Sequence, residues 1–380
     1  MRIGIDYISA LSHGGNATYS RELCRWLPRV ASGEEFIFFD YVHDWLQGRP
    51  RERFPRVVYV PAILSAFGRK ELIGVSDRVS CFLEQRSVRK QNIDVFHFTN
   101  PLQYRDLHCA TVVTIHDLAP YHDSSWAKAR SQTLLDNKLA AMIKNCRKFI
   151  AVSEFTKRDL VQYTNLAPEK ISVIYEAANS DFYPDADRVH VERVYGLTNF
   201  ILCVGQLQPR KNTLGLIEAY AGLPASLRKN FSLVFVGQYR EREYKEKVEA
   251  LIKKLRVNDH IVFLGGMKQA EMRKLYSCAY ISTFPSLFEG FGLPVVESIA
   301  CGTPVIVSNT SSLPEVAGTS CLLVDPHNVS QISATLERVL LDQTLYQNLK
   351  NNISQDAGRF SWKKTAEETL QTYDSILSDH

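Results

Sequence analysis

The sequence predicts an α/β protein with two doubly wound domains, and three features support this prediction. The chain has 380 residues, more than one hydrophobic core usually organises. Short runs rich in β-branched and aromatic residues alternate with longer amphipathic runs, which is typical of a mostly parallel sheet covered by helices on both faces. The alternation pauses over the polar, proline-containing segment 179–199 and then begins again, so this segment is interpreted as a linker between the domains.

The first half of the chain begins with RIGIDY (2–7), a short apolar run that predicts the opening strand of a domain. The amphipathic runs GNATYSRELCRWLPRV and AKARSQTLLDNKLAAMIKNC predict helices. Further strands are expected over residues 56–60, 94–99, 111–117, 148–153 and 171–177. Together these elements define a first domain over residues 1–180.

The second half repeats the pattern and defines a domain over residues 195–360. Its strands are expected over residues 200–205, 231–237, 260–265, 279–285 and 304–308, with helices between them. A last helix is expected over residues 361–377, and the segment 361–380 is predicted to pack back on the first domain. Since doubly wound sheets bind ligands at the carboxyl ends of their strands, the site is expected in a cleft across which the two domains face each other.

The composition excludes several classes of protein. Hydrophobic residues make up 45% and charged residues 23%, and no apolar run is long enough to span a bilayer. The N-terminus lacks the basic start, apolar stretch and cleavage site of a signal peptide. The eight cysteines form no C-x-x-C pair, which favours reduced core thiols over metal ligands. A net charge of +4 argues against a broad nucleic-acid groove. We therefore expect a cytoplasmic protein that binds no nucleic acid.

The segment 61–90, PAILSAFGRKELIGVSDRVSCFLEQRSVRK, combines apolar residues with cations and few acids. One interpretation is an amphipathic surface that lies on an anionic membrane. The other is an ordinary pair of amphipathic helices on the surface of the domain. A peripheral position at the inner face of a membrane is thus one of two open expectations.

The segment 284–306, FPSLFEGFGLPVVESIACGTPVI, holds two carboxylates in an otherwise apolar stretch. Glu289 follows a predicted buried strand, and Glu297 lies in the first turns of a helix that has Pro294 near its start. The backbone N–H groups of residues 290–293 lie at the N-terminus of this helix, where an anion is favoured. Two carboxylates there suit a ligand with several hydroxyls, since a carboxylate accepts two hydrogen bonds from a vicinal diol. The alternative is that both glutamates cap the loop or pair with surface cations.

A pair of cations follows the first strand of the second domain. QPRKN places Arg210 and Lys211 between this strand and the next helix, for which Asn212 or Thr213 is a suitable N-cap. Two cations beside a helix N-terminus favour a diphosphate. The alternative interpretation is solvated surface charge.

Three candidates remain to be weighed, two of them in the first domain. Gly14 and Gly15 follow the first strand and allow the backbone to approach a ligand closely, although a plain flexible turn has the same sequence. His116 ends a strand, where a functional histidine and a structural one are both plausible. The sequence DAD at residues 185–187 has the spacing of a metal-binding D-x-D, but it lies in the predicted linker without a preceding buried strand. No metal site is therefore expected.

Segment 284–306 closely resembles the signature of the retaining GT-B glycosyltransferases of family 4, which include sucrose-phosphate synthase-like and mannosyl- and rhamnosyltransferase-like enzymes. Four more segments resemble family motifs in the same order along the chain: HGGNATYSREL (13–23), VVTIHDLAP (112–120), IAVSEFTKRDL (150–160) and ILCVGQLQPRKN (201–212). The resemblance covers essentially the whole chain, and its most specific part is the carboxylate segment. One departure is Gln206, because the family often has arginine at this position.

The resemblance implies a role for each candidate. Arg210 and Lys211 neutralise the leaving nucleoside diphosphate, Glu289 holds hydroxyls of the donor sugar, Glu297 holds the ribose diol and His116 contacts the donor sugar. The catalytic set is then His116, Arg210, Lys211 and Glu289. The donor-binding set is Gly14, Gly15, Gly290, Phe291, Gly292, Leu293 and Glu297. The first domain is on the acceptor side, and the second domain binds the nucleotide sugar.

The implied reaction is the transfer of a hexose, with retention and without a metal or another cofactor, from a nucleoside-diphosphate sugar to a glycan or lipid-linked glycan in polysaccharide biosynthesis. GDP-mannose is the first donor to consider, because PRKN resembles mannosyl- and rhamnosyl-type members. Two other functions stay open: a nucleotide-sugar epimerase on the same fold, which needs no acceptor, and a non-catalytic subunit that binds a nucleotide sugar. A sugar phosphorylase is disfavoured, because the sequence contains no motif for a pyridoxal-bearing lysine.

Overall fold

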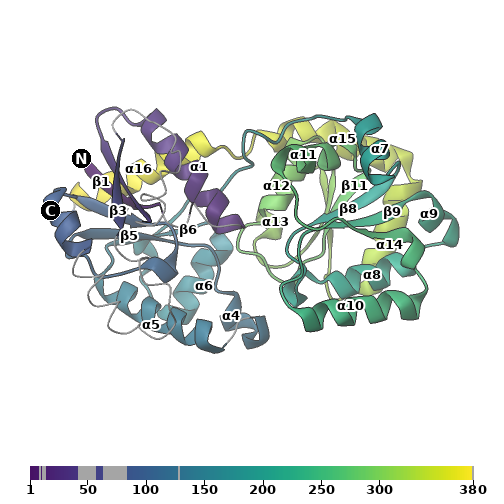
Figure 1. Ribbon diagram of the computed structural model, residues 1–380, viewed down its shortest axis with the longest axis horizontal. Helices are drawn as coiled ribbons and strands as arrows, with labels where there is room; N and C mark the ends of the chain where they lie inside the picture. Colours follow the sequence, from purple (N-terminus) through teal and green to yellow (C-terminus); the bar gives the residue numbers. More distant parts are fainter. Residues whose placement is uncertain (8–9, 11–13, 42–56, 63–83, 127–128, 379–380) are drawn as a thin grey trace. The chain divides into compact units, whose positions relative to one another are not determined.

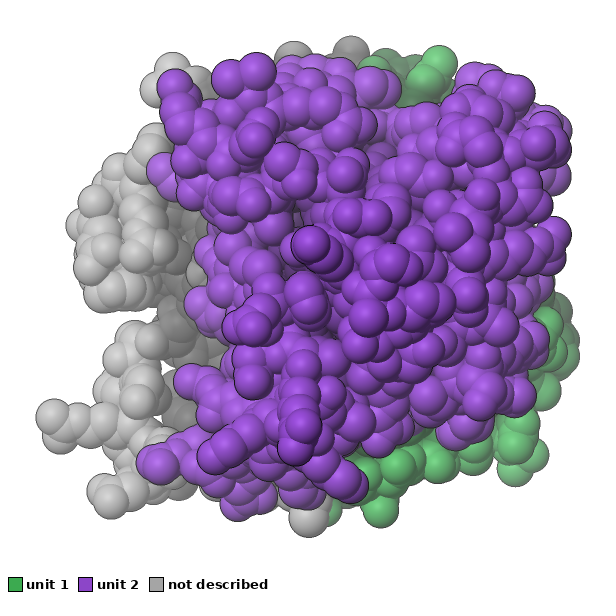
Figure 2. All heavy atoms as spheres, turned by 90° about the vertical axis from the view of Figure 1, so that its right-hand side faces the viewer, with its two compact units in different colours: residues 1–176, 361–380 green, residues 177–360 purple. Residues whose placement is uncertain are grey.

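The computed structural model describes residues 1–7, 10, 14–41, 57–62, 84–126 and 129–378 (Figure 1). The chain forms two compact units. Unit 1 comprises Met1–Glu176 and Ser361–His380, and unit 2 comprises Ala177–Phe360; Figure 2 colours them green and purple. Each unit is a doubly wound α/β domain with a parallel sheet, which confirms the predicted fold class. Most of segment 61–90, for which the sequence left two interpretations open, lies outside the described residues.

Unit 1 has, within its described residues, a seven-stranded sheet in the order β3-β2-β1-β4-β5-β6-β7. All of its strand pairs are parallel. The strands are β1 (Arg2–Asp6), β2 (Glu35–Tyr41), β3 (Val57–Ala62), β4 (Val95–Phe98), β5 (Ala110–Ile115), β6 (Lys148–Ala151) and β7 (Ile171–Val173). The helices are α1 (Gly15–Val30), α4 (Ala119–His122), α5 (Ala129–Asn145), α6 (Glu154–Thr164) and α16 (Trp362–Ser378), with short 3₁₀ turns η3 (Pro101–Gln103), η4 (Ser124–Trp126) and η5 (Pro168–Lys170).

The last helix, α16, belongs to unit 1 although it follows the whole of unit 2 in the sequence. It packs against α1, as Figure 1 shows. Two side-chain contacts attach it to the sheet and its edge. The hydroxyl of Thr365 donates to the carbonyl of Tyr175 at 2.7 Å, and the hydroxyl of Tyr373 lies 2.6 Å from Nδ1 of His97 in β4.

Unit 2 has a six-stranded sheet in the order β10-β9-β8-β11-β12-β13, which is the strand order of dinucleotide-binding folds. Its strands are β8 (Phe200–Val204), β9 (Ser232–Val236), β10 (Ile261–Phe263), β11 (Ile281–Phe284), β12 (Val305–Ser308) and β13 (Cys321–Val324). Its helices are α7 (Arg188–Tyr195), α8 (Thr213–Ala221), α9 (Ala225–Asn230), α10 (Arg242–Leu255), α11 (Gln269–Cys278), α12 (Leu293–Ala300), α13 (Leu313–Val316), α14 (Val329–Leu341) and α15 (Gln343–Ala357), with η6 (Pro209–Lys211) and η7 (Asn258–His260).

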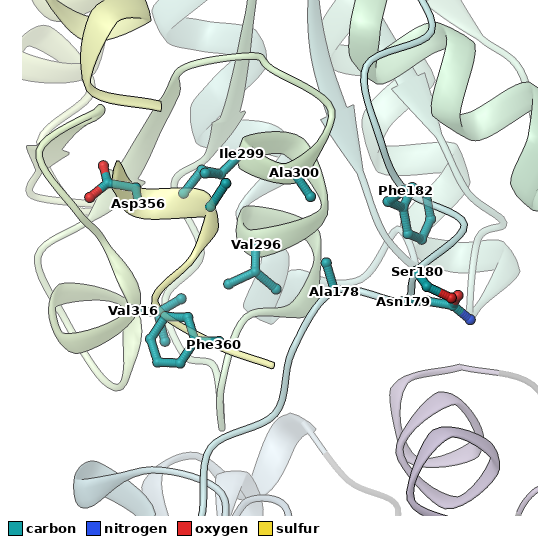
Figure 3. A pocket seen from close by; sticks show the side chains of 11 residues that line it. Ala178, Asn179, Ser180, Phe182, Val296, Ile299, Ala300, Val316, Asp356 and Phe360 are labelled. Atoms are coloured by element: carbon teal, nitrogen blue, oxygen red, sulfur yellow. The ribbon is translucent and has the colours of Figure 1, made fainter. Parts of the chain in front are cut away.

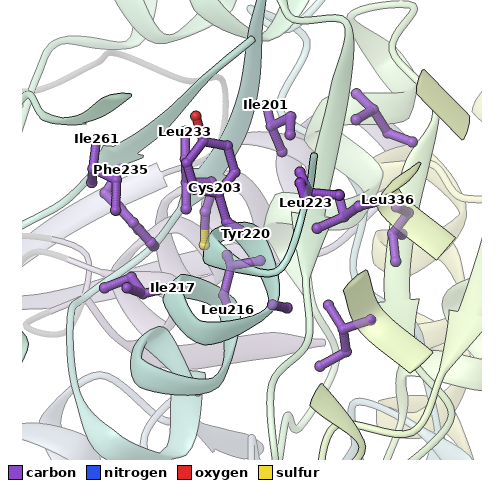
Figure 4. Packing of buried hydrophobic residues seen from close by; sticks show 14 of the residues in the cluster. Ile201, Cys203, Leu216, Ile217, Tyr220, Leu223, Leu233, Phe235, Ile261 and Leu336 are labelled. Carbon is purple, nitrogen blue, oxygen red and sulfur yellow. The ribbon is translucent and has the colours of Figure 1, made fainter. Parts of the chain in front are cut away.

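One hydrophobic cluster of unit 2 lies between the sheet and helices that include α8, α10 and α14. Alternate side chains of β8 and β9, such as Ile201 and Phe235, pack with apolar residues of α8, α10 and α14, such as Leu216, Val248 and Leu336. All five of these side chains are fully buried. Figure 4 labels Ile201, Phe235, Leu216 and Leu336 of this set. Helices α11, α12 and α15 lie on the other side of the sheet from α8 and α10 (Figure 1). Because both faces are covered, strands such as FILCV are apolar throughout rather than alternating.

The predicted linker 179–199 differs from expectation, because it contains helix α7 and lies within unit 2. Asp187 caps this helix, since its carboxylate accepts the N–H of His190 at 3.0 Å, and Gly196 ends it in the left-handed conformation. Val191 is the residue of α7 that is buried against the unit. The helix was missed because its other apolar residues, Val189 and Val194, are exposed and give no amphipathic pattern.

Candidate active site

The predicted cations lie at the switch point of the unit 2 sheet. Arg210 and Lys211 lie in η6, which follows β8 and leads into α8. The strand order reverses between β8 and β11, so the connections after these two strands leave toward opposite faces of the sheet, and doubly wound folds bind their ligands at such a point. The N–H of Leu287, after β11, donates to the carbonyl of Arg210 at 2.8 Å. The loop with the cations and the loop with the first carboxylate therefore meet at this point.

Asn212 joins these loops in a way that the sequence did not predict. It is the N-cap residue of α8, but it adopts the left-handed conformation with a φ of 56°. Its side-chain amide donates to the carbonyls of Pro285 and Pro326, at 3.0 and 2.7 Å, instead of accepting from the helix. Asn212 therefore fixes the position of the cation loop rather than capping α8 with its side chain.

Glu289 lies between the two cations. Lys211 Nζ donates to Oε1 of this carboxylate at 2.5 Å, and Arg210 Nη1 donates to Oε2 at 3.2 Å. Ser286 Oγ also donates to Oε1, at 2.8 Å. Because Glu289 is only 7% exposed, these contacts supply the hydrogen bonds that a buried carboxylate requires. The structure thus brings three predicted site residues into direct contact.

The charges in this cluster shift one another's pKa values. Burial alone would raise the pKa of the Glu289 carboxyl, but Lys211 and Arg210 outweigh burial and hold this pKa below its ordinary value. Burial lowers the pKa of the Lys211 ammonium group, Glu289 opposes this shift and Arg210 adds to it. With the two side chains charged and the carboxylate ionised, the cluster carries one net positive charge. It is therefore suited to bind an anion.

The turn that carries Glu289 is held by two serines from the loop after β12. Ser311 Oγ accepts the N–H of Glu289 at 3.0 Å. Ser312 Oγ donates to the carbonyls of Glu289 and Phe291, at 2.9 and 3.0 Å. These bonds fix the backbone on both sides of the predicted glycine turn. The sequence analysis missed both serines, because nothing local to the TSS sequence indicates a contact with a segment about 20 residues earlier.

Glycine is required at one position of this turn. Gly292 has a φ of 109°, and a side chain there would come within 2.7 Å of the Leu313 side chain. The turn leads directly into α12, which begins at Leu293 with Pro294 in its first turn, as predicted. The positive end of the α12 dipole therefore lies beside the cation cluster.

Glu297, the second carboxylate, lies farther along α12 and has a different partner. Its Oε2 accepts a hydrogen bond of 3.0 Å from the hydroxyl of Tyr276, which lies in α11. Tyr276 is fully buried, whereas Glu297 is partly exposed. The two predicted carboxylates are thus held by separate sets of contacts within unit 2.

The predicted histidine lies in unit 1, at the end of β5. Nε2 of His116 lies 2.9 Å from the carbonyl oxygen of Thr99, and Nδ1 lies 3.1 Å from Oε1 of Glu176. The carbonyl only accepts, so Nε2 carries a proton, and an ionised carboxylate at Nδ1 favours a second proton on the ring. Burial would lower the pKa of His116, but its hydrogen bond to Glu176 and the charge of that group raise it overall. Its contact with a donor sugar stays a prediction.

The predicted glycine pair also lies in unit 1. Gly14 and Gly15 are exposed at the start of α1, where Gly14 has a φ of 100° and a side chain would meet no atom within 4 Å. Tyr19, one turn into α1, packs edge-on against the ring of His116, with ring centroids 4.9 Å apart. The pair Gly14–Gly15 and His116 are therefore on neighbouring elements of unit 1. Neither has a described contact that tests its predicted role.

A cavity of about 170 Å³ lies in unit 2 beside α12. It is lined by Val296, Ile299 and Ala300 of α12, and by Ala178 and Phe360, which lie near the two ends of unit 2 in the sequence (Figure 3). None of the predicted site residues lines it. It is therefore separate from the charged cluster.

The D-x-D sequence has structural contacts. Asp185 pairs with Arg273 at 3.0 Å, and Asp187 pairs with Lys274 at 2.8 Å and caps α7. Among the residues that the structure describes, no three His, Cys, Asp or Glu side chains gather as a metal site would require. All seven cysteines within those ranges are free thiols.

Comparison with known proteins agrees with the fold and identifies the family. The family model described as glycosyl transferases group 1 matches residues 190–356, and the one described as glycosyltransferase family 4 matches residues 13–182. The O-antigen chain mannosyltransferase B of Escherichia coli is 30% identical over 266 residues, which cover 69% of each chain. The serotype-specific mannosyltransferase WbdA of Escherichia coli is 30% identical over 281 residues, which cover 70% of this chain and 34% of WbdA. The chain thus spans about a third of the length of WbdA.

The fold has a counterpart among solved structures. The Anabaena protein HepE, solved in complex with UDP and glucose, superposes with a TM-score of 0.78 at 18% sequence identity, covering 99% of this chain and 100% of HepE. Two parallel-sheet, Rossmann-like domains with this likeness define a protein of the GT-B class. The sequence matches go further than the fold, and the chain belongs to glycosyltransferase family 4.

Proposed function

We propose that this protein transfers a hexose from a nucleoside-diphosphate sugar to a glycan or lipid-linked glycan during the assembly of a bacterial surface polysaccharide. The observation that carries the proposal is the cluster of Arg210, Lys211 and Glu289 at the sheet's switch point. It combines positive charge for a diphosphate with a carboxylate for sugar hydroxyls. The similar E. coli mannosyltransferases support mannose as the sugar, so GDP-mannose is the first donor to test. The UDP in HepE supports a nucleoside diphosphate as the ligand class.

The cations stabilise the leaving group. When the bond between the anomeric carbon and the phosphate oxygen breaks, negative charge accumulates on the nucleoside diphosphate. Arg210 and Lys211 stabilise this negative charge. Their partly buried side chains are already held in place, so they need little rearrangement during the reaction, and the dipole at the N-terminus of α12 adds to the stabilisation. Each such donor contributes roughly 10²–10³ in kcat. Because these groups neutralise the diphosphate, we propose that the reaction requires no divalent metal and no other cofactor.

Glu289 orients the donor sugar. Its two bound cations and Ser286 hold the carboxylate in one geometry, so the sugar hydroxyls meet a preorganised acceptor. The acceptor hydroxyl attacks the anomeric carbon on the side from which the phosphate leaves. A new carbon–oxygen bond forms, the bond to the phosphate oxygen breaks, and the acceptor's proton passes to the departing diphosphate. The anomeric configuration is retained.

We propose a cytoplasmic location, with the acceptor presented at the inner face of a membrane. No helix within the described ranges is both long and apolar enough to cross a membrane. The basic composition of segment 61–90 supports a peripheral contact, which stays a prediction because residues 63–83 are not described.

The proposal is tested by incubating the protein with GDP-mannose, UDP-glucose and other nucleotide sugars, with glycan acceptors, in the presence and absence of EDTA. We expect one donor to give a glycosylated acceptor in which NMR finds the donor's anomeric configuration, at a rate that EDTA does not change. Glu289→Gln is the matched inactive variant. Binding without turnover would indicate a non-catalytic subunit, and conversion of the donor without an acceptor would indicate an epimerase.

A further inference from the structure

We propose that Tyr276 is a positioning residue that sets the orientation of the Glu297 carboxylate, and through it the discrimination between ribose and deoxyribose in the donor nucleotide. This inference rests on the proposed function and on the role that the family resemblance implies for Glu297, which is to hold the ribose diol of the donor nucleotide. Tyr276 itself touches no substrate in this account. Its effect reaches the ligand through one carboxylate oxygen.

The contact joins two helices on the same side of the unit 2 sheet (Figure 1). The Tyr276 hydroxyl, from α11, donates to Oε2 of Glu297, in α12, at 3.0 Å. The ring is fully buried and packs edge-on against Phe182, with centroids 5.8 Å apart. The carbonyl of Tyr276 accepts the hydroxyl of Thr303, just after α12, at 2.6 Å. The Tyr276 hydroxyl, which donates the hydrogen bond, therefore has a fixed position relative to the helix that carries Glu297.

The hydrogen bond between Tyr276 and Glu297 can run in only one direction. An ionised carboxylate only accepts, so the phenol must donate. Burial raises the pKa of the Tyr276 phenol, and the nearby Glu297 raises it further, so the hydroxyl keeps its proton at physiological pH. The bond is a charge-assisted hydrogen bond, which is stronger than a bond between neutral groups. It therefore restricts the position of Oε2 of Glu297 before any ligand arrives.

Orientation matters because a glutamate side chain has three rotatable bonds. A carboxylate with fewer fixed contacts samples more rotamers, and a diol that binds it must bear more of the entropy of selecting one. A carboxylate that is already oriented binds the two hydroxyls at a smaller entropic cost. Losing the phenol hydroxyl therefore weakens the contact to the ribose diol selectively.

The hydroxyl can be removed without displacing α11. The neighbouring residue, Ser277, accepts the N–H of Asp185 at 2.9 Å and donates to the carbonyl of Tyr183 at 3.5 Å. The ring of Tyr276 and its carbonyl contact with Thr303 are unchanged in phenylalanine. Tyr276→Phe is therefore expected to fold with the same helix positions and to differ by one hydrogen bond.

Tyr220→Phe is the matched control. Tyr220 is fully buried in α8 of the same unit, and its hydroxyl donates to the carbonyl of Phe231 at 2.7 Å. The substitution thus removes a buried phenol hydroxyl of the same kind without touching a carboxylate. Glu297→Gln is the reference for full loss of the diol contact.

The experiment measures calorimetric affinities of the full-length protein and its variants for GDP and 2′,3′-dideoxy-GDP, with UDP and its dideoxy form as the second pair. Loss of one hydrogen bond predicts a GDP affinity that is roughly three- to tenfold weaker in Tyr276→Phe. The dideoxy nucleotide, which has no diol, should bind the variant and the wild type equally. The double variant with Glu297→Gln should lose no more than Glu297→Gln alone. Tyr220→Phe should bind all four nucleotides as the wild type does.

Two results would overturn the inference while leaving the proposed function intact. One is an equal loss of affinity for GDP and for the dideoxy form in Tyr276→Phe, which would assign Tyr276 a general structural role. The other is an unchanged GDP affinity in a variant that transfers sugar normally. If the wild type bound no nucleoside diphosphate at all, the proposed function itself would fail, and this inference with it.

Discussion

The replacement Lys211→Ala probes the centre of the proposed site. Lys211 Nζ donates to Glu289 at 2.5 Å, and both side chains are largely buried. If Lys211 stabilises the departing diphosphate, its removal should lower kcat by about 10²–10³, the loss typical of removing one preorganised donor. Arg210 remains as the second cation, so some activity should survive. The assay is steady-state release of the nucleoside diphosphate with the donor and acceptor that support transfer.

The same replacement should destabilise the protein. Breaking a buried ion pair by removing one partner costs about 3–5 kcal/mol when nothing replaces it. Here Glu289 keeps its bonds to Arg210 and Ser286 and is 7% exposed, so the loss should be nearer the cost of one unsatisfied bond to a charged group, about 1–3 kcal/mol. Urea unfolding measures this free energy.

The loss of stability should depend on pH in a defined direction. In the wild type the pKa of Glu289 is lowered from its ordinary value of 4.5, so its ionised form stabilises the folded protein above that pH. This contribution disappears as the pH falls through the lowered pKa. Without Lys211 the pKa of Glu289 should rise, because burial is then less opposed. The difference in unfolding free energy between wild type and variant should therefore be largest near neutral pH and shrink in acid.

Lys245→Ala is the control for this prediction. Lys245 lies in α10 of the same unit and pairs with Glu249 at 3.6 Å, but both side chains are more than half exposed. Its loss should change neither kcat nor unfolding free energy beyond about 0.5 kcal/mol. An unchanged kcat in Lys211→Ala would refute the leaving-group role. If Lys211→Ala kept full stability but lost activity, the predicted contribution of the buried ion pair to stability would be wrong, and the catalytic role of Lys211 would still hold.

The remaining predictions concern the second carboxylate and the unit 1 histidine. Glu297→Gln should weaken binding of the ribonucleoside diphosphate about tenfold, because a charged acceptor of the diol becomes a neutral amide; equal affinities by calorimetry would count against this role. Glu176→Gln should lower the pKa of His116, since the hydrogen bond and charge that raise it are removed. In the wild type the raised pKa means that the pair stabilises the fold fully below the ordinary value of 6.5, and that this contribution is lost as the pH rises through the raised pKa. Histidine NMR titration of both proteins checks the shift, and an identical midpoint would show that Glu176 does not set it.

Much of the fold could be predicted because its signals are local. Apolar strands such as FILCV, and helices such as the one from Gly15 to Val30, have boundaries that composition indicates well. Two strands were missed. β2, EFIFFDY, was missed although the Ser-Gly pair before it is typical of a turn, and β13, CLLV, is an edge strand in which Leu323 is exposed. The strand order was not predictable, since it depends on contacts between distant segments.

The site could be predicted as a set of residues but not as a set of contacts. The sequence identified Arg210, Lys211 and Glu289 separately, and the structure shows that they share hydrogen bonds. Glu176 and Tyr276 were missed for the same physical reason. Glu176 is 60 residues from His116, and Tyr276 is 21 residues from Glu297, so each pairing arises only when strands and helices are packed together.

The central claim is that unit 2 binds a nucleoside diphosphate through Lys211 and its neighbours without a metal. The most direct test is a thermal-shift panel of UDP, GDP, ADP, CMP and dTDP, with and without Mg²⁺, on the wild type and on Lys211→Ala. A ligand at 100 times its Kd adds about 2.7 kcal/mol to stability, which is readily measured as a rise in melting temperature. We expect one diphosphate to raise the melting temperature of the wild type, equally with and without Mg²⁺, and to have a smaller effect on the variant. No shift with any of the five nucleotides, or a shift that requires Mg²⁺ and is the same in both proteins, would contradict the claim.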